Sequence, residues 1–414
     1  MNRLTRIGID GFRSLSDCEI RFPDNEQNAL LCLVGKNGSG KSAVLHALDF
    51  AGQMFRGDIS SWLAERNWQA GDLVPSARQG MLHFAIDGVV AGQAFGWSSA
   101  LDPATLKCVR EELRMDGRRV FELSDKGLAI KGRNVLSAAH ESTGTDAEQP
   151  GVHEIFANEG SFLSTLSDKF LQACGLLEVV RFLKGMAFQE TQNVHLLRQR
   201  SRKADRTDDA GRGKTSLACR VAALSASDRQ RLLEKMQGFF PWIAGIRIVS
   251  LPEGTRELVF REQDESGSAP ARREVPAAQA GDGLLRLTAL LCALLSSDTV
   301  LAVNEIENGL HPEMIGQLVQ ELRSSGKQIV FTTHSPVVVN ALPDDVARES
   351  VLLVLRKSLG STGICRFFWA LRGYLWVRAP IPSLAFSPGT ISISEGSCHC
   401  LHCKDIFREF INSI

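Results

Sequence analysis

A phosphate-binding pattern sets the strongest constraint on the fold of this 414-residue chain. The segment Gly35-Lys-Asn-Gly-Ser-Gly-Lys-Ser42 matches G-x-x-x-x-G-K-[ST] in full. It follows the continuous apolar run Ala29–Val34, which is typical of a strand buried on both faces of a sheet. Residues 44–55 then have the pattern of a helix. Because a strand, a glycine-rich loop and a helix occur in this order around a phosphate, we expect an α/β phosphate-loop fold.

The chemistry of phosphate binding assigns a role to each part of this loop. Its glycines let consecutive N–H groups turn towards the phosphates, and the following helix directs its positive end at them. Lys41 is a predicted catalytic residue that reaches the β- and γ-phosphates of ATP, and the hydroxyl of Ser42 is expected to bind Mg²⁺. The predicted nucleotide-binding residues are Gly35, Lys36, Asn37, Gly38, Ser39, Gly40, Lys41 and Ser42.

Polar residues follow two later apolar runs, at the strand ends where parallel sheets bind ligands. Val300–Val303 leads into Asn304 and Glu305, and residues 329–333 lead into His334. Glu305 is placed to act as the general base that activates the attacking water. His334 is expected to contact the γ-phosphate. Asn304 stands where a carboxylate would order the Mg²⁺ shell, so the predicted metal contact there is a neutral amide.

The rest of the pattern divides the chain into strand-rich and helix-rich parts. Residues 81–132 consist of strand-like segments separated by turns, whereas residues 136–240 are largely helical and polar. Within the helical part, residues 198–214 are rich in charge and almost free of apolar residues. We interpret them as a solvated linker, with a nucleic-acid contact as the alternative. Residues 283–333 alternate helix, strand, helix and strand, which predicts a βαβ unit in a parallel sheet.

Bulk composition argues against some functions. Lys+Arg and Asp+Glu both number 47, so the net charge gives no general support for a nucleic-acid or membrane partner. No secretory signal and no uninterrupted apolar stretch of about 18 residues is visible, so no membrane-spanning helix is expected. The ten cysteines show no disulfide spacing over the first 364 residues. Reduced thiols and a cytoplasmic location are therefore expected.

Five motifs, in order along residues 1–356, give the chain a specific resemblance. They are Gly11-Phe-Arg-Ser-Leu15, Gly35–Ser42, Gly281-Asp-Gly-Leu-Leu-Arg-Leu287, Asn304-Glu-Ile-Glu-Asn-Gly-Leu-His-Pro312 and Thr333-His-Ser-Pro336. Together they resemble the ABC-type P-loop ATPases of the SMC, RecF and OLD group, and most closely the stand-alone bacterial AAA-family ATPases of defence or mobile loci. The resemblance implies an α/β ABC-type head, which is a mostly parallel sheet flanked by helices, with an antiparallel β subdomain and a helical insertion.

The resemblance also suggests a division of the chain into four parts. These are residues 1–135, the N-terminal part of the head with the phosphate loop; 136–240, the helical insertion with a flexible linker near 198–214; 241–356, the C-terminal part of the head with the signature, Walker B and switch histidine; and 357–414, an atypical tail of unknown role. The tail contains Cys398-His-Cys-Leu-His-Cys403. A metal site is one reading of that run, but its ligands are crowded for a single ion, so an unstructured end is favoured.

Members of this group sandwich two ATP molecules between two heads, so the resemblance implies a homodimer. A signature loop of one head caps the γ-phosphate of the other, and Gly281, Asp282 and Gly283 occupy that position here. Gln79 stands where a glutamine that senses Mg²⁺ is expected, as a nucleotide and metal contact. Gly281 replaces the usual serine and Asn304 the usual acid. ATP binding with slow hydrolysis is therefore expected.

Three function classes fit these motifs. The first is an ATPase that engages head to head on ATP and acts on a partner in DNA maintenance or phage defence. The second is a nucleotide-gated regulatory subunit with very low hydrolysis, which controls an effector protein and is favoured by Asn304 and Gly281. The third, a transporter motor, is disfavoured because the signature is not Leu-Ser-Gly-Gly. DNA and an effector protein are both candidate partners, and no membrane partner is expected.

Overall fold

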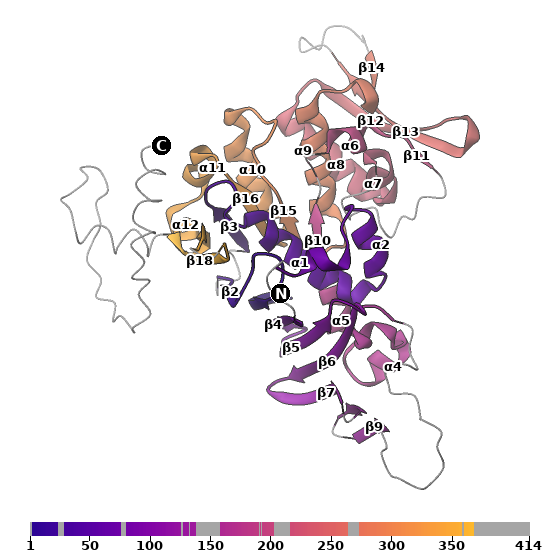
Figure 1. The fold of residues 1–414 in the computed structure, drawn as a ribbon. Helices are drawn as coiled ribbons and strands as arrows, with labels where there is room; N and C mark the ends of the chain where they lie inside the picture. Colours follow the sequence, from indigo (N-terminus) through magenta and orange to yellow (C-terminus); the bar gives the residue numbers. More distant parts are fainter. Residues whose placement is uncertain are drawn as a thin grey trace, which may run out of the picture.

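A six-stranded sheet forms the centre of the molecule in the computed structural model (Figure 1). Its strands are, in order, β10 (Met186–Gln189), β15 (Val300–Val303), β16 (Gln328–Thr333), β3 (Leu30–Val34), β17 (Val351–Arg356) and β18 (Thr362–Arg366). Neighbours are parallel except for the antiparallel hairpin β17–β18. The structure describes residues 2–23, 29–75, 80–125, 127–131, 133–137, 158–189, 191, 193–202, 216–263, 273–357 and 360–367.

The strand before the phosphate loop shows why its sequence is uniformly apolar. Leu31 and Leu33 of β3 point into one hydrophobic core, whereas Leu30, Cys32 and Val34 point into a second core on the opposite face of the sheet. All five side chains are at most 1% exposed. A strand covered on both faces needs an apolar residue at every position, which confirms the expectation for this run.

An eight-stranded antiparallel sheet packs over the first core. Its strands are, in order, β2 (Cys18–Arg21), β1 (Arg3–Asp10), β4 (Leu82–Val90), β5 (Gln93–Asp102), β6 (Lys107–Met115), β7 (Arg118–Ser124), β8 (Gly127–Ile130) and β9 (Arg133–Ser137). Two hairpins turn at Ala91-Gly92 and Asp116-Gly117, where all four residues have positive φ, as tight two-residue hairpins require. Between this sheet and the central sheet lie α1 (Lys41–Arg56) and α5 (Leu177–Lys184), which contribute to the same core.

Helices cover the second core on the other side of the central sheet. They are α6 (Val194–Arg198), α7 (Leu217–Ala223), α8 (Ala226–Phe239), α9 (Asp282–Leu295) and α10 (Pro312–Ser324). A small sheet of β11 (Ser201–Arg202), β12 (Ile243–Ser250), β13 (Thr255–Glu262) and β14 (Arg273–Pro276) lies at the end of the molecule away from β4–β7 (Figure 1). The shorter helices are α2 (Ile59–Ala64), α4 (Asp168–Ala173), α11 (Pro336–Ala341) and α12 (Asp344–Ser350). None of the helices in the described residues is long and apolar enough to cross a membrane.

The central sheet includes two strands from outside the two expected halves of the head. β10 lies within residues 136–240, which were expected to be a helical insertion, and it forms the edge beside β15. β18 lies beyond residue 356, where the atypical tail was expected to begin, and it pairs with β17. Both strands are short, so their sequences carry too little alternation to mark them. Residues 203–214 of the expected linker and residues 368–414 of the tail, with its Cys398–Cys403 run, lie outside the described residues.

The side chain of Gln328 joins the two large sheets. Gln328, on β16, accepts the backbone N–H of Leu4 at 2.6 Å and donates to the carbonyl of Leu4 at 2.8 Å. Leu4 needs these partners because β2 pairs with β1 only from Arg6 onwards. The amide of Gln328 thus replaces the missing strand neighbour and satisfies two buried backbone groups.

We expect Gln328→Ala to lower the free energy of unfolding by about 2–4 kcal/mol, because it leaves a buried donor and a buried acceptor of Leu4 without partners. Chemical denaturation followed by circular dichroism measures the change. Gln230→Ala, on the exposed face of α8, is the matched control and should change stability by less than about 0.5 kcal/mol. Equal stability of the two variants would contradict the role given to Gln328.

Candidate nucleotide site

The phosphate loop joins β3 to α1 and has the conformation that its glycines allow. Gly40 has a φ of 107°, in the left-handed region that favours glycine, and it is the N-cap of α1. The ammonium of Lys41 donates to the carbonyl oxygens of Gly35 at 2.6 Å and Lys36 at 2.9 Å. Lys41 is thus folded over the loop beside the positive end of α1, where an incoming phosphate can take over these contacts.

A cavity of about 360 Å³ collects residues from distant parts of the sequence. Residues 37–43 supply one wall, and Asn304, Glu305 and His334 supply another. They meet because β3, β16 and β15 are adjacent parallel strands, whose carboxyl ends lie at one edge of the sheet. The structure therefore brings the predicted lysine, the predicted general base and the predicted γ-phosphate sensor to one place.

The side chains of Glu305 and His334 contact each other at the edge of this cavity. His334 Nε2 lies 3.3 Å from Glu305 Oε1. Glu305 has a φ of 48°, a left-handed conformation that costs a non-glycine residue about 1–2 kcal/mol. Its backbone N–H donates to the hydroxyl of Thr332 at 2.8 Å, which holds this strained residue at the end of β15. This hydrogen bond from the neighbouring strand offsets the strain and keeps the carboxylate of Glu305 at the cavity.

The same hydroxyl of Thr332 also orients the side-chain amide of Asn304. Thr332 Oγ1 accepts from Glu305, so its single proton is free to donate, and it donates to Asn304 Oδ1 at 2.7 Å. The amide oxygen is thereby turned towards Thr332. Asn304 therefore lines the cavity as a neutral amide whose oxygen already accepts one hydrogen bond. Sequence reasoning identified the substitution of the acid but gave no role to Thr332.

Lys41 is the residue in the cavity with the most perturbed charge. Burial lowers the pKa of its ammonium to about 8, and the carboxylates of Glu305 and Glu307 oppose that shift. Only 6% of the residue is exposed, so the cost of keeping the charge is mainly desolvation. A bound anion would restore the preference for the charged form. The lysine is therefore poised to respond to a phosphate.

The hairpin β17–β18 supports the phosphate loop from behind. Thr362, the first residue of β18, donates its hydroxyl to the carbonyl of Ser39 at 3.2 Å and lies 2.8 Å from the hydroxyl of Ser14. A Cβ at Gly40 would lie 2.0 Å from that Thr362 hydroxyl. Gly40 is thus needed both for its backbone angle and for this close approach. No sequence pattern marked Thr362, because the residue lies in what was expected to be the tail.

Arg13 also lines the cavity, although sequence reasoning gave it no role of its own. Its guanidinium lies 4.3 Å from the centroid of the Trp68 ring. Burial lowers the pKa of Arg13, and the carboxylate of Asp72 counteracts the shift. The sequence feature that could have pointed to Arg13 is the Gly11–Leu15 motif, which contains it. A fixed cation beside the phosphate loop adds a second positive group to the cavity.

Several predicted contacts do not line this cavity. Gly35 and Lys36 lie behind the part of the loop that does. The signature residues 281–283 are at the start of α9, where Gly281 and Asp282 are exposed. Gln79 lies outside the described residues. Within one chain, the site is therefore built without the signature.

The exposed start of α9 is held in place by two contacts. Arg198, on α6, donates to Asp282 at 2.5 Å and to the carbonyl of Ala280 at 3.0 Å. Gly283 packs against the loop after Glu305 so closely that a Cβ there would lie 2.5 Å from the carbonyl oxygen of Gly309. The signature segment and the loop that carries the predicted base are thus in direct contact.

The cavity fits the phosphates of ATP better than it fits a Mg²⁺ shell of the usual kind. A lysine, an arginine and a helix N-terminus face it, and all three favour anions. The hydroxyl of Ser42 is available as a metal ligand. The oxygen of Asn304 accepts a hydrogen bond from Thr332, so a neutral oxygen with one remaining lone pair is what it could offer a cation. No group of three or more His, Cys, Asp or Glu that could hold a metal is found in the described residues.

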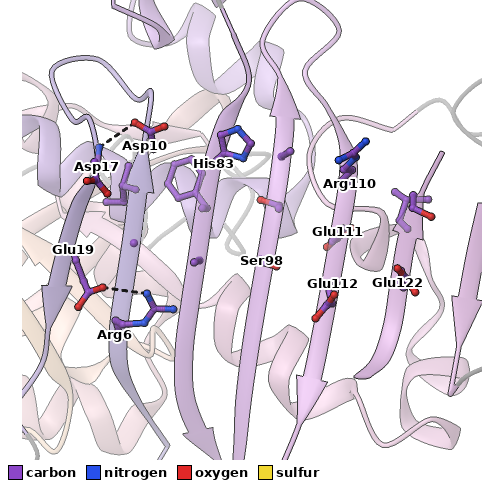
Figure 2. Close-up of a pocket in the computed structure, with 18 of the residues that line it drawn as sticks. Arg6, Asp10, Asp17, Glu19, His83, Ser98, Arg110, Glu111, Glu112 and Glu122 are labelled. Atoms are coloured by element: carbon purple, nitrogen blue, oxygen red, sulfur yellow. Dashed lines mark hydrogen bonds and ion pairs between the residues drawn. The ribbon is translucent and has the colours of Figure 1, made fainter. Parts of the chain in front are cut away.

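A second hollow, of about 780 Å³, lies on the outward face of the antiparallel sheet (Figure 2). Its floor is a row of small residues in register across β1, β4 and β5, namely Gly8, Ala85 and Ser98. Charged side chains around it pair with one another, as Arg6 and Glu19 do at 3.3 Å. The hollow arises from small residues between paired charges, and none of the predicted site residues lines it.

Two family models match parts of the chain. The model described as "AAA domain, putative AbiEii toxin, Type IV TA system" matches residues 176–340, which include Asn304, Glu305 and His334. The model described as "AAA ATPase domain" matches residues 3–58, which include the phosphate loop. No curated protein matches the sequence.

Solved structures of SMC heads are similar to the chain. The SMC head bound to the C-winged helix domain of ScpA has a TM-score of 0.52 at 14% identity, and the match covers 89% of this chain and 99% of that one. The SMC head of Thermotoga maritima has a TM-score of 0.42 at 15% identity, with 88% and 98% covered. The Pyrococcus furiosus head with an extended coiled coil, bound to the C-terminal domain of ScpA, has a TM-score of 0.47 at 12% identity, with 92% and 100% covered. The first similarity shows a shared fold.

We expect ATP binding to take up a proton above pH 8. The pKa of Lys41 is lowered to about 8 without nucleotide, and the phosphates favour its charged form, so binding at higher pH must protonate the amine. ATP affinity should then fall by about tenfold per pH unit above pH 8, until the raised pKa of the complex is reached. Calorimetry at pH 9, in two buffers with different ionisation enthalpies, measures the uptake. Equal binding enthalpies in the two buffers would contradict the expectation.

Proposed function

We propose that this chain, an ABC-type P-loop ATPase with the fold of an SMC head, binds ATP in the 360 Å³ cavity and hydrolyses it slowly. The observation that carries the proposal is the convergence of Lys41, Glu305 and His334 on that one cavity from three adjacent parallel strands. A phosphate loop without the other two side chains would support binding alone. A carboxylate 3.3 Å from a histidine, beside the same loop, adds the groups that water attack on a phosphate needs.

Each group has a defined task in this reaction. Lys41 leaves the carbonyls of its own loop and contacts the β- and γ-phosphates. Glu305 accepts a proton from water while the water oxygen bonds to the γ-phosphorus, and the bond from that phosphorus to the bridging oxygen breaks, which releases ADP and phosphate. His334 donates to the γ-phosphate and keeps Glu305 oriented. Mg²⁺ bound at Ser42 would neutralise charge on the phosphate oxygens.

Slow turnover follows from the way Asn304 is held. Its amide is neutral where a carboxylate would attract the cation, and its oxygen already accepts a hydrogen bond from Thr332. Gly281 further lacks the hydroxyl that a serine would bring to the phosphate of a second head. These two substitutions also support the second candidate function, a nucleotide-gated regulatory subunit that controls an effector protein with very little hydrolysis.

The proposed assembly is a homodimer of heads that encloses ATP. Its support is the exposed start of α9, which lies outside the cavity of its own chain and is free to reach the cavity of another. The start of α9 has unpaired N–H groups that suit a γ-phosphate. Asp282, which would repel that phosphate, is neutralised by Arg198.

The proposed setting is cytoplasmic, in phage defence or DNA maintenance. One family model carries the name of a toxin of type IV toxin–antitoxin systems, which favours defence and an effector partner. The similar SMC head is bound to a winged-helix domain of ScpA, which makes a protein partner plausible for a head of this fold. Binding assays with duplex DNA would separate a DNA-handling ATPase from a regulator of a protein.

We expect Lys41→Ala to abolish ATP binding and Glu305→Gln to retain it while lowering kcat by about 100-fold or more, because only the base is lost. Glu305→Gln should also accumulate as an ATP-bound dimer. Turnover assays and light scattering with and without ATP measure both effects. A wild type that binds ATP tightly without turnover would instead favour the regulatory subunit, and absence of ATP binding would reject the proposal.

We expect Asn304→Asp to raise kcat by about tenfold, which corresponds to about 1.4 kcal/mol of transition-state stabilisation. An aspartate still accepts the Thr332 hydroxyl with one oxygen and offers the second to the cation. Steady-state turnover at saturating ATP and Mg²⁺ gives the comparison. Asn340→Asp, which adds the same charge on the exposed side of α11, is the control and should leave turnover unchanged. If both variants match the wild type, the amide is not what limits turnover.

A further inference from the structure

The carboxylate of Glu307 holds the backbone of the predicted γ-phosphate sensor. The N–H of His334 donates to Glu307 Oε1 at 2.8 Å, and the N–H of Ser335 donates to the same oxygen at 3.2 Å. These two donors form the turn between β16 and α11, and Ser335 is the N-cap of α11 without a side-chain cap of its own. Glu307 thus supplies from another segment the acceptor that this turn lacks.

Glu307 acts from behind the cavity. It is two residues beyond Glu305 in the loop after β15, and it is not one of the residues that line the cavity. The two loops therefore touch twice, once through the side chains of Glu305 and His334 and once through Glu307 and the backbone of His334. The first contact depends on the second, because the imidazole reaches Glu305 only while its backbone stays in place.

Glu307 is half-buried, but one of its oxygens is fully enclosed. This oxygen, Oε2, has no hydrogen-bond partner among the residues that the structure describes. An unpaired buried carboxylate oxygen is costly. Two charge-assisted hydrogen bonds at Oε1 offset that cost and hold the turn more firmly than neutral bonds would. Glu307 also opposes the lowering of the Lys41 pKa, which places its charge near the phosphate loop.

We propose that Glu307 is a positioning residue, which fixes the turn at His334 so that the imidazole reaches both Glu305 and the γ-phosphate. The proposal rests on the function proposed above, because it assumes that His334 contacts the γ-phosphate. It requires that Glu307 act only through His334. A general structural role would instead weaken the binding of ATP and ADP equally, both in the wild type and in the His334→Ala variant.

The test compares affinities for ATP and ADP, which do not depend on turnover. Calorimetry is performed on wild type, Glu307→Ala, Glu307→Gln, His334→Ala and the double variant Glu307→Ala/His334→Ala, with kcat measured in parallel. Thermal unfolding confirms that each variant is folded. Glu349→Gln, at an exposed position on α12, is the control for loss of one surface carboxylate and should behave as wild type.

We expect Glu307→Ala and His334→Ala each to weaken ATP binding by about 10- to 100-fold, with ADP binding within about threefold of wild type. The double variant should match His334→Ala. Glu307→Gln, whose amide oxygen can still accept both N–H groups, should retain most of the preference for ATP. Exchange of the amide hydrogens of residues 334 and 335 should accelerate in Glu307→Ala.

Three outcomes would overturn the positioning role. One is unchanged ATP affinity in Glu307→Ala. Another is a further loss in the double variant of the size seen in Glu307→Ala alone. The third is an equal loss for ADP and ATP. Failure of the proposed function gives a different result. If the wild type has no turnover but still prefers ATP to ADP, the affinities of the Glu307 variants still test the positioning role. If His334→Ala keeps the normal preference for ATP, both the sensor role of His334 and the positioning role of Glu307 are rejected.

Discussion

The pairing of β16 with β3 on one side and with β15 on the other determines where this protein can do chemistry. Residues on β3 and β16 that face each other are about 300 positions apart in the sequence. Because parallel strands end at the same edge, their loops bring together a lysine, a carboxylate and a histidine. The flanking layers serve this arrangement, since two separate hydrophobic cores bury both faces of these strands. Gln328 then fixes the antiparallel sheet, with Arg13 near its edge, to the same strand.

Short-range polar contacts refine what the sheet brings together. A single hydroxyl, on Thr332, accepts from the strained Glu305 and donates to the amide oxygen of Asn304. Glu307 holds the next turn from behind. These contacts involve backbone groups or one side-chain proton, and each fixes an orientation rather than a location. In the function proposed above, the rate of hydrolysis depends on the neutral amide that Asn304 presents in place of a carboxylate.

The sequence predicted the parts of this site that have a recognisable pattern. The phosphate loop, the strands before Glu305 and His334, and the helices α9 and α10 could be predicted because buried strands and helices leave runs and periods of apolar residues. Thr332, Glu307 and Thr362 could not, because a side chain that bonds to a backbone group obeys no period. β10 and β18 were missed since edge strands of four or five residues are too short to show alternation. The Gly11–Leu15 motif was visible, but the position of Arg13 over Trp68 requires the fold.

The hairpin that supports the phosphate loop has a consequence for the order in which the protein can mature. The loop follows β3 directly, but β16, β17 and Thr362, which flank or support it, are made about 300 residues later. At about 5–20 residues per second, the ribosome needs roughly 15–60 s to reach them after β3 has been made. Until then β3 is an apolar strand with two open edges, which is a state that invites wrong pairing or a chaperone. A newly made chain therefore completes its candidate nucleotide site only after Thr362 has been made, and products that stop before β16 lack the residues that flank the loop.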